Sequence, residues 1–436
     1  MMKKNIKTNI ILQIFIFLLM TLMLLYPAQY MSLKICLVSL IISFCIAYKW
    51  KKIKVYKYVV GWMAIYISFN IFFIFLSLFY GNNISHVLNI NIIEPILYFC
   101  IIVLIDEKYY RILIKYITVI TIIITIYNII YAFSINGLLP GIVSENMPGV
   151  FVDIGGLYLG YKKITTQNIS WLLFLIPYFI SKTFIEREAR RRYLYYFISG
   201  LGIINALLCL RTAYIIGLIL AAILVFGFAI ITRIKLEKRV ICFWGIMFAI
   251  ALISIFCIND FREKVIELFF DVAGAFRNSS TINEFGVVDG GGSIRYEQFK
   301  DLINTWKQKP LLGWGDPSNA QNVIRSDVVG NYELTYVAML MQRGILGMTI
   351  YVLQIGWIYV KLIKIIRHKN KYAKEGFCVL VAFSVMLFAN ATNPYLKSFD
   401  RLIIQFWPLI LINLDAMYFQ NNREIVLRRG ETKCQL

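Results

Sequence analysis

Charged residues are scarce in this sequence of 436 residues. Asp, Glu, Lys and Arg make up 16% of it, against about 25% in an ordinary soluble domain. Hydrophobic residues make up 59%, so the composition excludes a soluble globular enzyme, a disordered chain and a coiled coil. The apolar runs are long rather than short and alternating, which excludes a transmembrane β-barrel. The sequence therefore predicts an all-α polytopic membrane protein.

Histidine and paired cysteines are also rare. The chain has two His and eight Cys, and no two cysteines form a C-x-x-C pair. Seven of the cysteines lie in or beside apolar runs, which is typical of small core residues rather than of disulfides or metal ligands. We therefore expect no metal ion and no cofactor.

Acidic residues are few beside basic ones, with 24 Asp and Glu against 45 Lys and Arg, for a net charge of +21. In a soluble protein this excess would indicate nucleic-acid binding. Most of the basic residues, however, fall on one side of the membrane if the N-terminus is cytoplasmic, as the positive-inside rule requires. We therefore expect both termini in the cytoplasm, an even number of spans and no nucleic-acid partner.

About 20 mostly apolar residues are needed to cross a bilayer, and roughly twelve runs of the chain meet this need. The first run follows MMKKNIKTN and lacks a small-residue cleavage site, so we expect an uncleaved span rather than a signal peptide. The expected spans are Ile10–Tyr26, Leu33–Tyr48, Tyr58–Phe79, Leu88–Ile105, Ile112–Ser134, Ile169–Ile185, Leu194–Leu210, Ala213–Thr232, Val240–Ile258, Gly344–Leu362, Phe377–Asn390 and Leu402–Phe419.

Two long segments are expected at the outer face of this single membrane domain, at residues 135–168 and 259–332. The second carries eight basic and ten acidic residues, which favours a folded segment. Within it, residues 296–308 place Phe299, Leu302, Ile303 and Trp306 at helical spacing, so we expect an amphipathic helix at the membrane surface. The two halves of the chain do not match, which argues against a pseudo-symmetric transporter and favours chemistry on the outer loops.

Residues 293–347 form the most informative stretch. They read SIRYEQFKDLINTWKQKPLLGWG, then a polar gap, then NYELTYVAMLMQRGILG. A second element, LCLRTAYIIGL, places Arg211 between two adjoining spans. Their order resembles the O-antigen polymerase and O-antigen ligase superfamily, membrane glycosyltransferases that act on undecaprenyl-linked glycans at the outer membrane face. The matching positions are Arg211, Arg295, the turn residues Pro310, Gly313 and Gly315, Glu333, and the final pair Gly344 and Gly347.

The resemblance implies roles for three of these residues. Arg211 and Arg295 would clamp the two phosphates of the lipid donor, since guanidinium groups match phosphate oxygens and stay charged. Glu333 would accept the proton of the acceptor sugar hydroxyl. The other interpretations are interfacial arginines reaching lipid head groups and an acid favoured at a helix N-terminus. No His follows the turn and Leu334 stands where the family has Asn, which favours a polymerase over a ligase.

Three further residues are candidates for substrate binding. Glu94 lies within an expected span and is followed by Pro95, and intramembrane acids are often functional. A carboxyl hydrogen-bonded between helices is an equally good interpretation of Glu94. Arg343 is expected either to pair with an acid or to touch phosphate. Trp314 is one of several outer aromatic residues that are candidates for stacking on sugars.

The sequence thus predicts a membrane polysaccharide polymerase of the cell envelope, for capsule or exopolysaccharide. It would transfer a glycan from undecaprenyl pyrophosphate to the next lipid-linked repeat unit, with inversion by resemblance and without a metal. Its expected partners are the lipid-linked oligosaccharide, the bilayer, and flippase and chain-length regulator proteins. No cofactor is expected. The alternatives are an O-antigen-ligase-like transfer to a lipid, protein or wall acceptor, a lipid-linked oligosaccharide flippase or transporter, and a receptor without chemistry.

Overall fold

The computed structural model describes residues 2–49, 55–139, 150–157, 161–209, 211–246, 290–323 and 328–433. Within these residues the chain is almost entirely helical, and seven helices are long and apolar enough to cross a membrane. These seven are Lys57–Phe79, Ser85–Leu104, Glu107–Ile135, Ala189–Cys209, Ala213–Thr232, Thr335–Arg367 and Phe399–Gln420. Shorter apolar helices lie at Ile10–Leu25, Met31–Ala47 and Ile169–Ile185. The predicted polytopic helical fold is confirmed.

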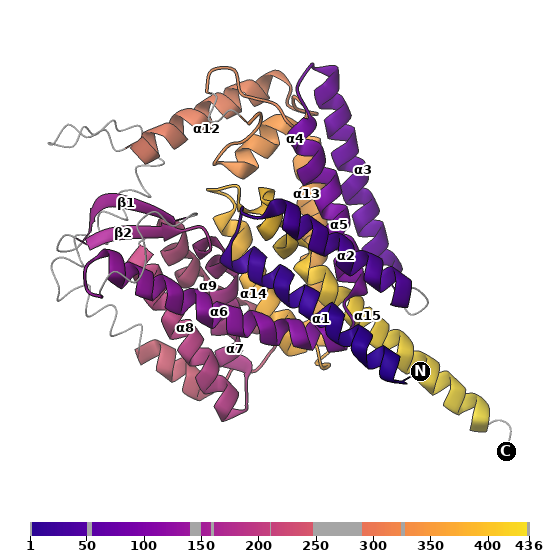
Figure 1. The fold of residues 1–436 in the computed structure, drawn as a ribbon. Helices are drawn as coiled ribbons and strands as arrows, with labels where there is room; N and C mark the ends of the chain where they lie inside the picture. The colour runs from indigo at the N-terminus through magenta and orange to yellow at the C-terminus, as the bar shows by residue number, and fades with distance from the viewer. Residues whose placement is uncertain are drawn as a thin grey trace.

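The helices follow the apolar runs closely (Figure 1). Every expected span lies on a helix except Val240–Ile258, most of which falls outside the described residues. The helix bounds are α1 Met2–Leu25, α2 Met31–Lys49, α3 Lys57–Phe79, α4 Ser85–Leu88, α5 Glu94–Leu104, α6 Glu107–Ile135, α7 Ile169–Ile185, α8 Ala189–Cys209, α9 Thr212–Thr232, α12 Gly290–Gln308, α13 Thr335–Arg367, α14 Ala373–Ala389 and α15 Phe399–Lys433. A π-helical segment, Asn89–Ile93, joins α4 to α5, and a short 3₁₀ turn, Tyr395–Lys397, precedes α15.

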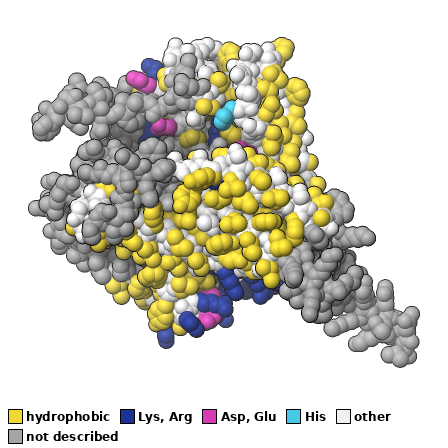
Figure 2. All heavy atoms as spheres, viewed as in Figure 1, with side chains coloured by type: hydrophobic (Ala, Val, Ile, Leu, Met, Phe, Trp, Pro, Cys, Tyr) yellow, Lys and Arg dark blue, Asp and Glu magenta, His cyan; other side chains and the backbone are white. Residues whose placement is uncertain are grey.

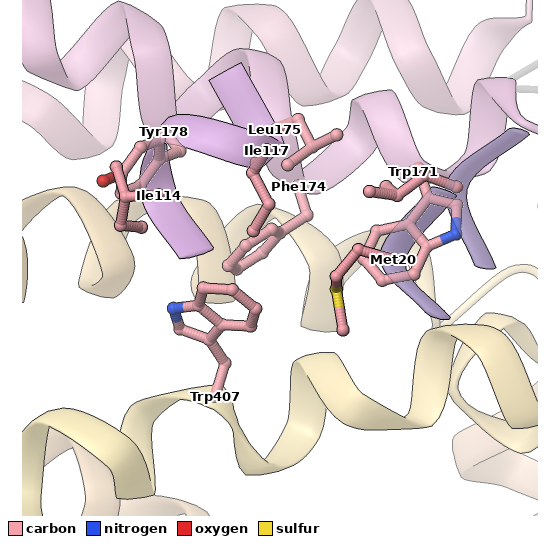
Figure 3. Close-up of a pocket in the computed structure, with 9 residues that line it drawn as sticks. Met20, Ile114, Ile117, Trp171, Phe174, Leu175, Tyr178 and Trp407 are labelled. Atoms are coloured by element: carbon pink, nitrogen blue, oxygen red, sulfur yellow. The ribbon is translucent and has the colours of Figure 1, made fainter. Parts of the chain in front are cut away.

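Helix α7 lies at the centre of the bundle and is buried along its whole length. A helix that is apolar on every side is stable only where other helices surround it. It packs against α8, α9 and α14, and α1, α6 and α15 close over it. Figure 3 shows this meeting point, where Trp407 of α15 faces Phe174 of α7 and Met20 of α1 lies beside Trp171. The small cavity between them is lined by apolar side chains.

A two-stranded hairpin interrupts the helical pattern between α6 and α7. Strand β1, Val150–Leu157, pairs antiparallel with β2, Tyr161–Thr166, and Val150 lies opposite Thr166. The hairpin falls in the segment 135–168, which the sequence predicts to be a long outer segment. It adds one pair of strands to the predicted all-α fold.

The outer surface of the bundle is dominated by apolar side chains. Figure 2 shows a broad apolar face across the middle of the molecule, with Lys and Arg side chains gathered below it. Exposed apolar residues such as Phe75 and Ile223 contribute to such surfaces on separate helices. An extended apolar surface of this kind is suited to lipid rather than to water.

The second long segment of the sequence is described only in part, because residues 259–289 lie outside the described residues. Helix α12 contains the range 296–308, for which the sequence predicts an amphipathic helix. Leu302 is buried against Tyr332 and Met341, as helical spacing predicts. Phe299 is exposed instead, while the polar side chains of Gln298 and Thr305 turn inward. The inward face of α12 is thus more polar than the spacing of its apolar residues indicates.

Candidate functional site

A break in α13 forms the frame of the candidate site. Gly344 has a non-helical backbone, with φ of 61° and ψ of −170°. Such a break leaves backbone groups without partners inside the helix, and these groups need other partners when buried. The turn that follows α12 supplies them through three backbone hydrogen bonds, from Trp314 N to Met341 O (3.2 Å), from Ile345 N to Pro310 O (2.9 Å) and from Leu346 N to Leu311 O (3.1 Å). The G-x-G turn and the broken helix therefore form one unit.

Two glycines make this close approach possible. Gly313 and Gly344 both have positive φ, which other residues rarely adopt. A Cβ atom at Gly344 would meet the backbone of Leu311, and one at Gly313 would meet the backbone of Gln342. The spacing of glycines in the sequence is thus explained by the contact between the turn and α13.

The turn is also fixed to α3 and carries Asp316 into the interior. The Asp316 N–H donates to Phe73 O at 3.2 Å, and the Ser77 hydroxyl donates to Pro317 O at 2.5 Å. The buried carboxylate of Asp316 then accepts from Arg343 Nε at 2.8 Å and from Asn91 Nδ2 at 3.2 Å. Arg343, a predicted substrate-binding residue, is therefore held in an ion pair.

The pKa values of two loop residues reflect this cluster. Burial raises the pKa of Asp316, but nearby Arg343 and Lys397 and the hydrogen bonds from Arg343 and Asn91 outweigh it, so the pKa lies below its usual value. Burial lowers the pKa of Lys397 below its usual value. The negative charge of Asp316 opposes this effect, and the positive charge of Arg343 adds to it. Asp316 is thus ionised at neutral pH and balances part of the positive charge around it.

Arg295 and Glu333, two predicted catalytic residues, lie together. Arg295 Nε donates to Glu333 Oε2 at 2.8 Å, although the residues are 38 positions apart in the chain. Both side chains are partly exposed, at 35% and 25%. Gln298 fixes the same junction, because its Oε1 accepts from the Leu334 N–H at 3.0 Å. The packing of α12 on α13 therefore places a cation and a carboxylate at an accessible position at the start of α13.

Arg211, the third predicted catalytic residue, lies in a different part of the same end of the bundle. It is the N-cap of α9 and lies close enough to Arg401 for the two positive charges to interact. Arg401 belongs to the first turn of α15, and its Nη1 donates to Ser170 Oγ at 2.6 Å. Lys397 connects the two parts, since its Nζ donates to Gly330 O at 3.4 Å, in the loop that leads to Glu333. We call Arg211, Arg295, Glu333, Lys397 and Arg401 the arginine site.

The two remaining predicted residues, Glu94 and Trp314, are held by other elements of the fold. Glu94 follows the π-helical segment, is 8% exposed, and its Oε2 has no hydrogen-bond partner among the described residues. π-helical segments often mark functional positions in helices. Trp314 donates from Nε1 to Thr305 O at 2.9 Å, and Lys309 Nζ lies 3.7 Å from its ring centre. The indole N–H of Trp314 is thus hydrogen-bonded within the protein, and one face of its ring is covered by the Lys309 ammonium group.

The sequence singled out neither Arg401 nor the buried pair beside it. Lys34 Nζ lies 2.6 Å from Asp400 Oδ1, and both side chains are almost completely buried. Lys34, Lys397 and Arg401 read as charges at the edges of spans, where lysine and arginine commonly reach the lipid head groups. The signal in the sequence is limited to two basic residues that precede the last expected span, Lys397 and Arg401.

Comparison with known proteins gives one match. Residues 197–352 match the model of the O-antigen ligase family. This ligase-family region contains Arg211, Arg295, Glu333 and Arg343, whereas Glu94 and Arg401 lie outside it. No curated protein and no solved structure matches the chain.

The match confirms the resemblance to the O-antigen polymerase and ligase superfamily for this region. It supports a multi-pass membrane protein that transfers polysaccharide, of the ligase or polymerase type. A lipid-linked glycan is the substrate that the ligase-family region implies.

Proposed function

We propose that this protein is a polysaccharide polymerase of the cell membrane, with its site at the outer face. It transfers a growing glycan from undecaprenyl pyrophosphate to the next lipid-linked repeat unit. The observation that carries this proposal is the pairing of Arg295 with Glu333 inside the ligase-family region. A phosphate-binding group and a proton acceptor are the two functions that this transfer requires, and here they are in contact.

A hydroxyl oxygen of the acceptor sugar bonds to the anomeric carbon of the donor glycan, with inversion. The bond from that carbon to the pyrophosphate oxygen breaks, and undecaprenyl pyrophosphate leaves with the electron pair. The hydroxyl proton passes to the Glu333 carboxylate. Arg211 and Arg295 stabilise the charge that develops on the leaving pyrophosphate, so no metal ion is required for this task.

The ion pair between Arg295 and Glu333 implies that Arg295 acts first and Glu333 second. In the free enzyme the Glu333 carboxylate accepts a hydrogen bond from Arg295 Nε at 2.8 Å. A pyrophosphate group competes for the same guanidinium and forms stronger, bidentate hydrogen bonds. When Arg295 turns to phosphate, the Glu333 carboxylate is released to accept the proton of the acceptor hydroxyl. Donor binding thereby prepares the carboxylate for proton transfer.

A ligase that transfers finished glycan to a lipid, protein or wall acceptor is the second candidate. The family model itself favours it, because the matching model is that of O-antigen ligase. The acid at Glu333, in place of the histidine that the ligases of the superfamily carry, favours the polymerase. Flippase and chain-length regulator proteins are the partners that a polymerase of this kind would have.

Profiling of lipid-linked glycans by mass spectrometry tests the proposal. A deletion strain is complemented with wild type, Arg295→Ala, Glu333→Gln or the control Lys300→Ala, which alters an exposed residue of the same helix. We expect single repeat units to accumulate on the outer leaflet, with rescue by wild type and Lys300→Ala only. Long lipid-linked chains that never leave their carrier would establish the ligase instead. Single units confined to the inner leaflet would identify a flippase and refute the proposal.

A further inference from the structure

Arg211 and Arg401 are brought together by helices that begin at the same end of the bundle. Gly217, in the second turn of α9, packs against Leu173, in the second turn of α7. Arg401, in the first turn of α15, is hydrogen-bonded to Ser170 in the first turn of α7. The starts of α7, α9 and α15 therefore lie side by side, and both arginines stand there. Helix N-termini add partial positive charge to this region.

The acid next to Arg401 in the chain, Asp400, interacts with its charge but forms no hydrogen bond with the Arg401 guanidinium among the described residues. The Asp400 carboxylate is occupied on both oxygens: Oδ1 lies 2.6 Å from Lys34 Nζ, and Oδ2 accepts from the Ala28 N–H at 2.7 Å. Lys34 is fixed in turn, because Nζ also donates to Tyr26 O at 2.7 Å. The hydrogen bonds of Asp400 therefore go to Lys34 and Ala28, and the guanidinium of Arg401 keeps hydrogen-bond donors for another acceptor.

Most hydrogen-bond donors of the two arginines are unused by the described residues. An arginine side chain has five N–H donors. Arg401 donates from Nη1 to Ser170 Oγ and from Nε to Tyr395 O at 3.2 Å. The guanidinium of Arg211 forms no hydrogen bond or ion pair with a described residue. Two guanidinium groups near each other, without a carboxylate in contact, repel unless an anion lies between them.

We propose that Arg401 is a binding residue for the pyrophosphate of the lipid-linked donor and holds this group together with Arg211. This inference rests on the proposed function and extends the site beyond the ligase-family region, into the first turn of α15. The inference also gives different roles to Arg211 and Arg401 on one side and to Arg295 on the other. Arg211 and Arg401, which form no ion pair with a described carboxylate, are open to an anion, whereas Arg295 is paired with Glu333 until the donor arrives.

The geometry distinguishes this role from a structural one. A structural Arg401 would serve only to join α15 to α7 and to the 3₁₀ turn, through Ser170 and Tyr395. A lysine cannot reproduce the fork of a guanidinium, but it keeps the charge. Arg401→Lys should therefore retain part of the pyrophosphate affinity, and Arg401→Gln should lose it. Ser170→Ala removes only one anchor of Arg401 and should have a smaller effect.

Direct binding to the full-length protein in nanodiscs tests the inference. The probe is geranylgeranyl pyrophosphate, and the competitors are geranylgeranyl monophosphate, inorganic pyrophosphate and phosphatidylglycerol. The variants are Arg401→Gln, Arg401→Lys and Ser170→Ala, with Arg367→Gln as the control. Arg367 is exposed at the far end of α13, and among the described residues it donates only to the backbone carbonyl of Ile231. Melting temperatures are recorded for each variant, so that misfolding is separated from lost binding.

We expect Arg401→Gln to weaken binding of the pyrophosphate lipid about 10- to 100-fold, the effect of losing hydrogen bonds to a charged group. Arg367→Gln should bind like wild type, and phosphatidylglycerol should not compete. Equal binding by Arg401→Gln and wild type would overturn the inference and leave the proposed function intact. Competition by phosphatidylglycerol at similar concentrations would also overturn it, because the site would then take any anionic head group. If wild type binds no pyrophosphate lipid, the proposed function fails as well.

Discussion

Replacing Lys34 with Met should destabilise the protein by about 3–5 kcal/mol, the cost of leaving one partner of a buried ion pair alone. The size follows from the burial, since the Lys34 and Asp400 side chains are 0% and 1% exposed. Water therefore cannot take the place of the missing ammonium group. In the variant, Asp400 would keep only the hydrogen bond from the Ala28 N–H.

A thiol-reactive fluorescent dye provides the assay, because Cys45, Cys209 and Cys378 are free and buried and become reactive on unfolding. For a chain of 436 residues the average unfolding entropy is about 0.9 kcal/mol per kelvin. The expected loss therefore corresponds to a melting temperature about 3–5 °C below that of wild type.

Two controls separate the buried pair from a general effect of lost charge. Lys34→Met combined with Asp400→Asn removes both charges and should restore most of the stability, because Asn still accepts from the Ala28 N–H. Lys371→Met breaks a pair with Glu107 in which both side chains are about one third exposed, and should cost at most about 1 kcal/mol. A Lys34→Met variant that melts like wild type, or a double variant that melts no higher than it, would refute the reasoning.

Three other changes have expected outcomes. Gly344→Ala should lower the melting temperature more than Lys34→Met or prevent folding, since its Cβ would meet the Leu311 backbone; a variant as stable as wild type would contradict the contact. Asp316→Asn should remove a pH-dependent part of the stability, measured as melting temperature from pH 3 to 8. Its folded pKa is lowered, so the ionised carboxylate stabilises the wild type above about pH 4, and this contribution is lost as the pH falls through the folded pKa. Glu94→Gln should leave the melting temperature unchanged or higher, because it removes a buried acid whose Oε2 has no hydrogen-bond partner among the described residues. If the carboxyl binds substrate, the same change lowers the glycan yield at least tenfold, and an unchanged glycan profile would exclude that role.

The helices could be predicted from the sequence because apolar runs of membrane length leave the backbone few alternatives. The expected span Ile169–Ile185 has the same bounds as α7. The break in α13 was harder to foresee, since the expected span begins at Gly344, whereas the helix begins at Thr335 and continues through the break. The hydrogen bonds that stabilise this break come from another segment, and hydropathy does not report them.

The candidate site was predictable where it is local in sequence and unpredictable where it depends on distant contacts. Arg295 and Glu333 belong to one motif-bearing segment, and packing of α12 on α13 brings them together. Lys34 and Asp400 are 366 positions apart, so no spacing rule connects them. Arg401 was hidden for the same reason, because it keeps hydrogen-bond donors for another acceptor only when Asp400 is occupied by Lys34. The π-helical segment before Glu94 likewise has no distinct sequence signal.

The distance along the chain between Lys34 and Asp400 also has a consequence for biogenesis. Synthesis at about 5–20 residues per second separates the emergence of the two residues by roughly 20–70 s. During that time the lysine of α2 has no carboxylate from α15, and its charge must stay near the aqueous edge of the bilayer. Insertion of the last helix then withdraws Lys34 from water and completes the start of α15 where Arg401 stands. A truncated chain would display the unpaired lysine, a mark by which membrane quality control can distinguish unfinished molecules from finished ones.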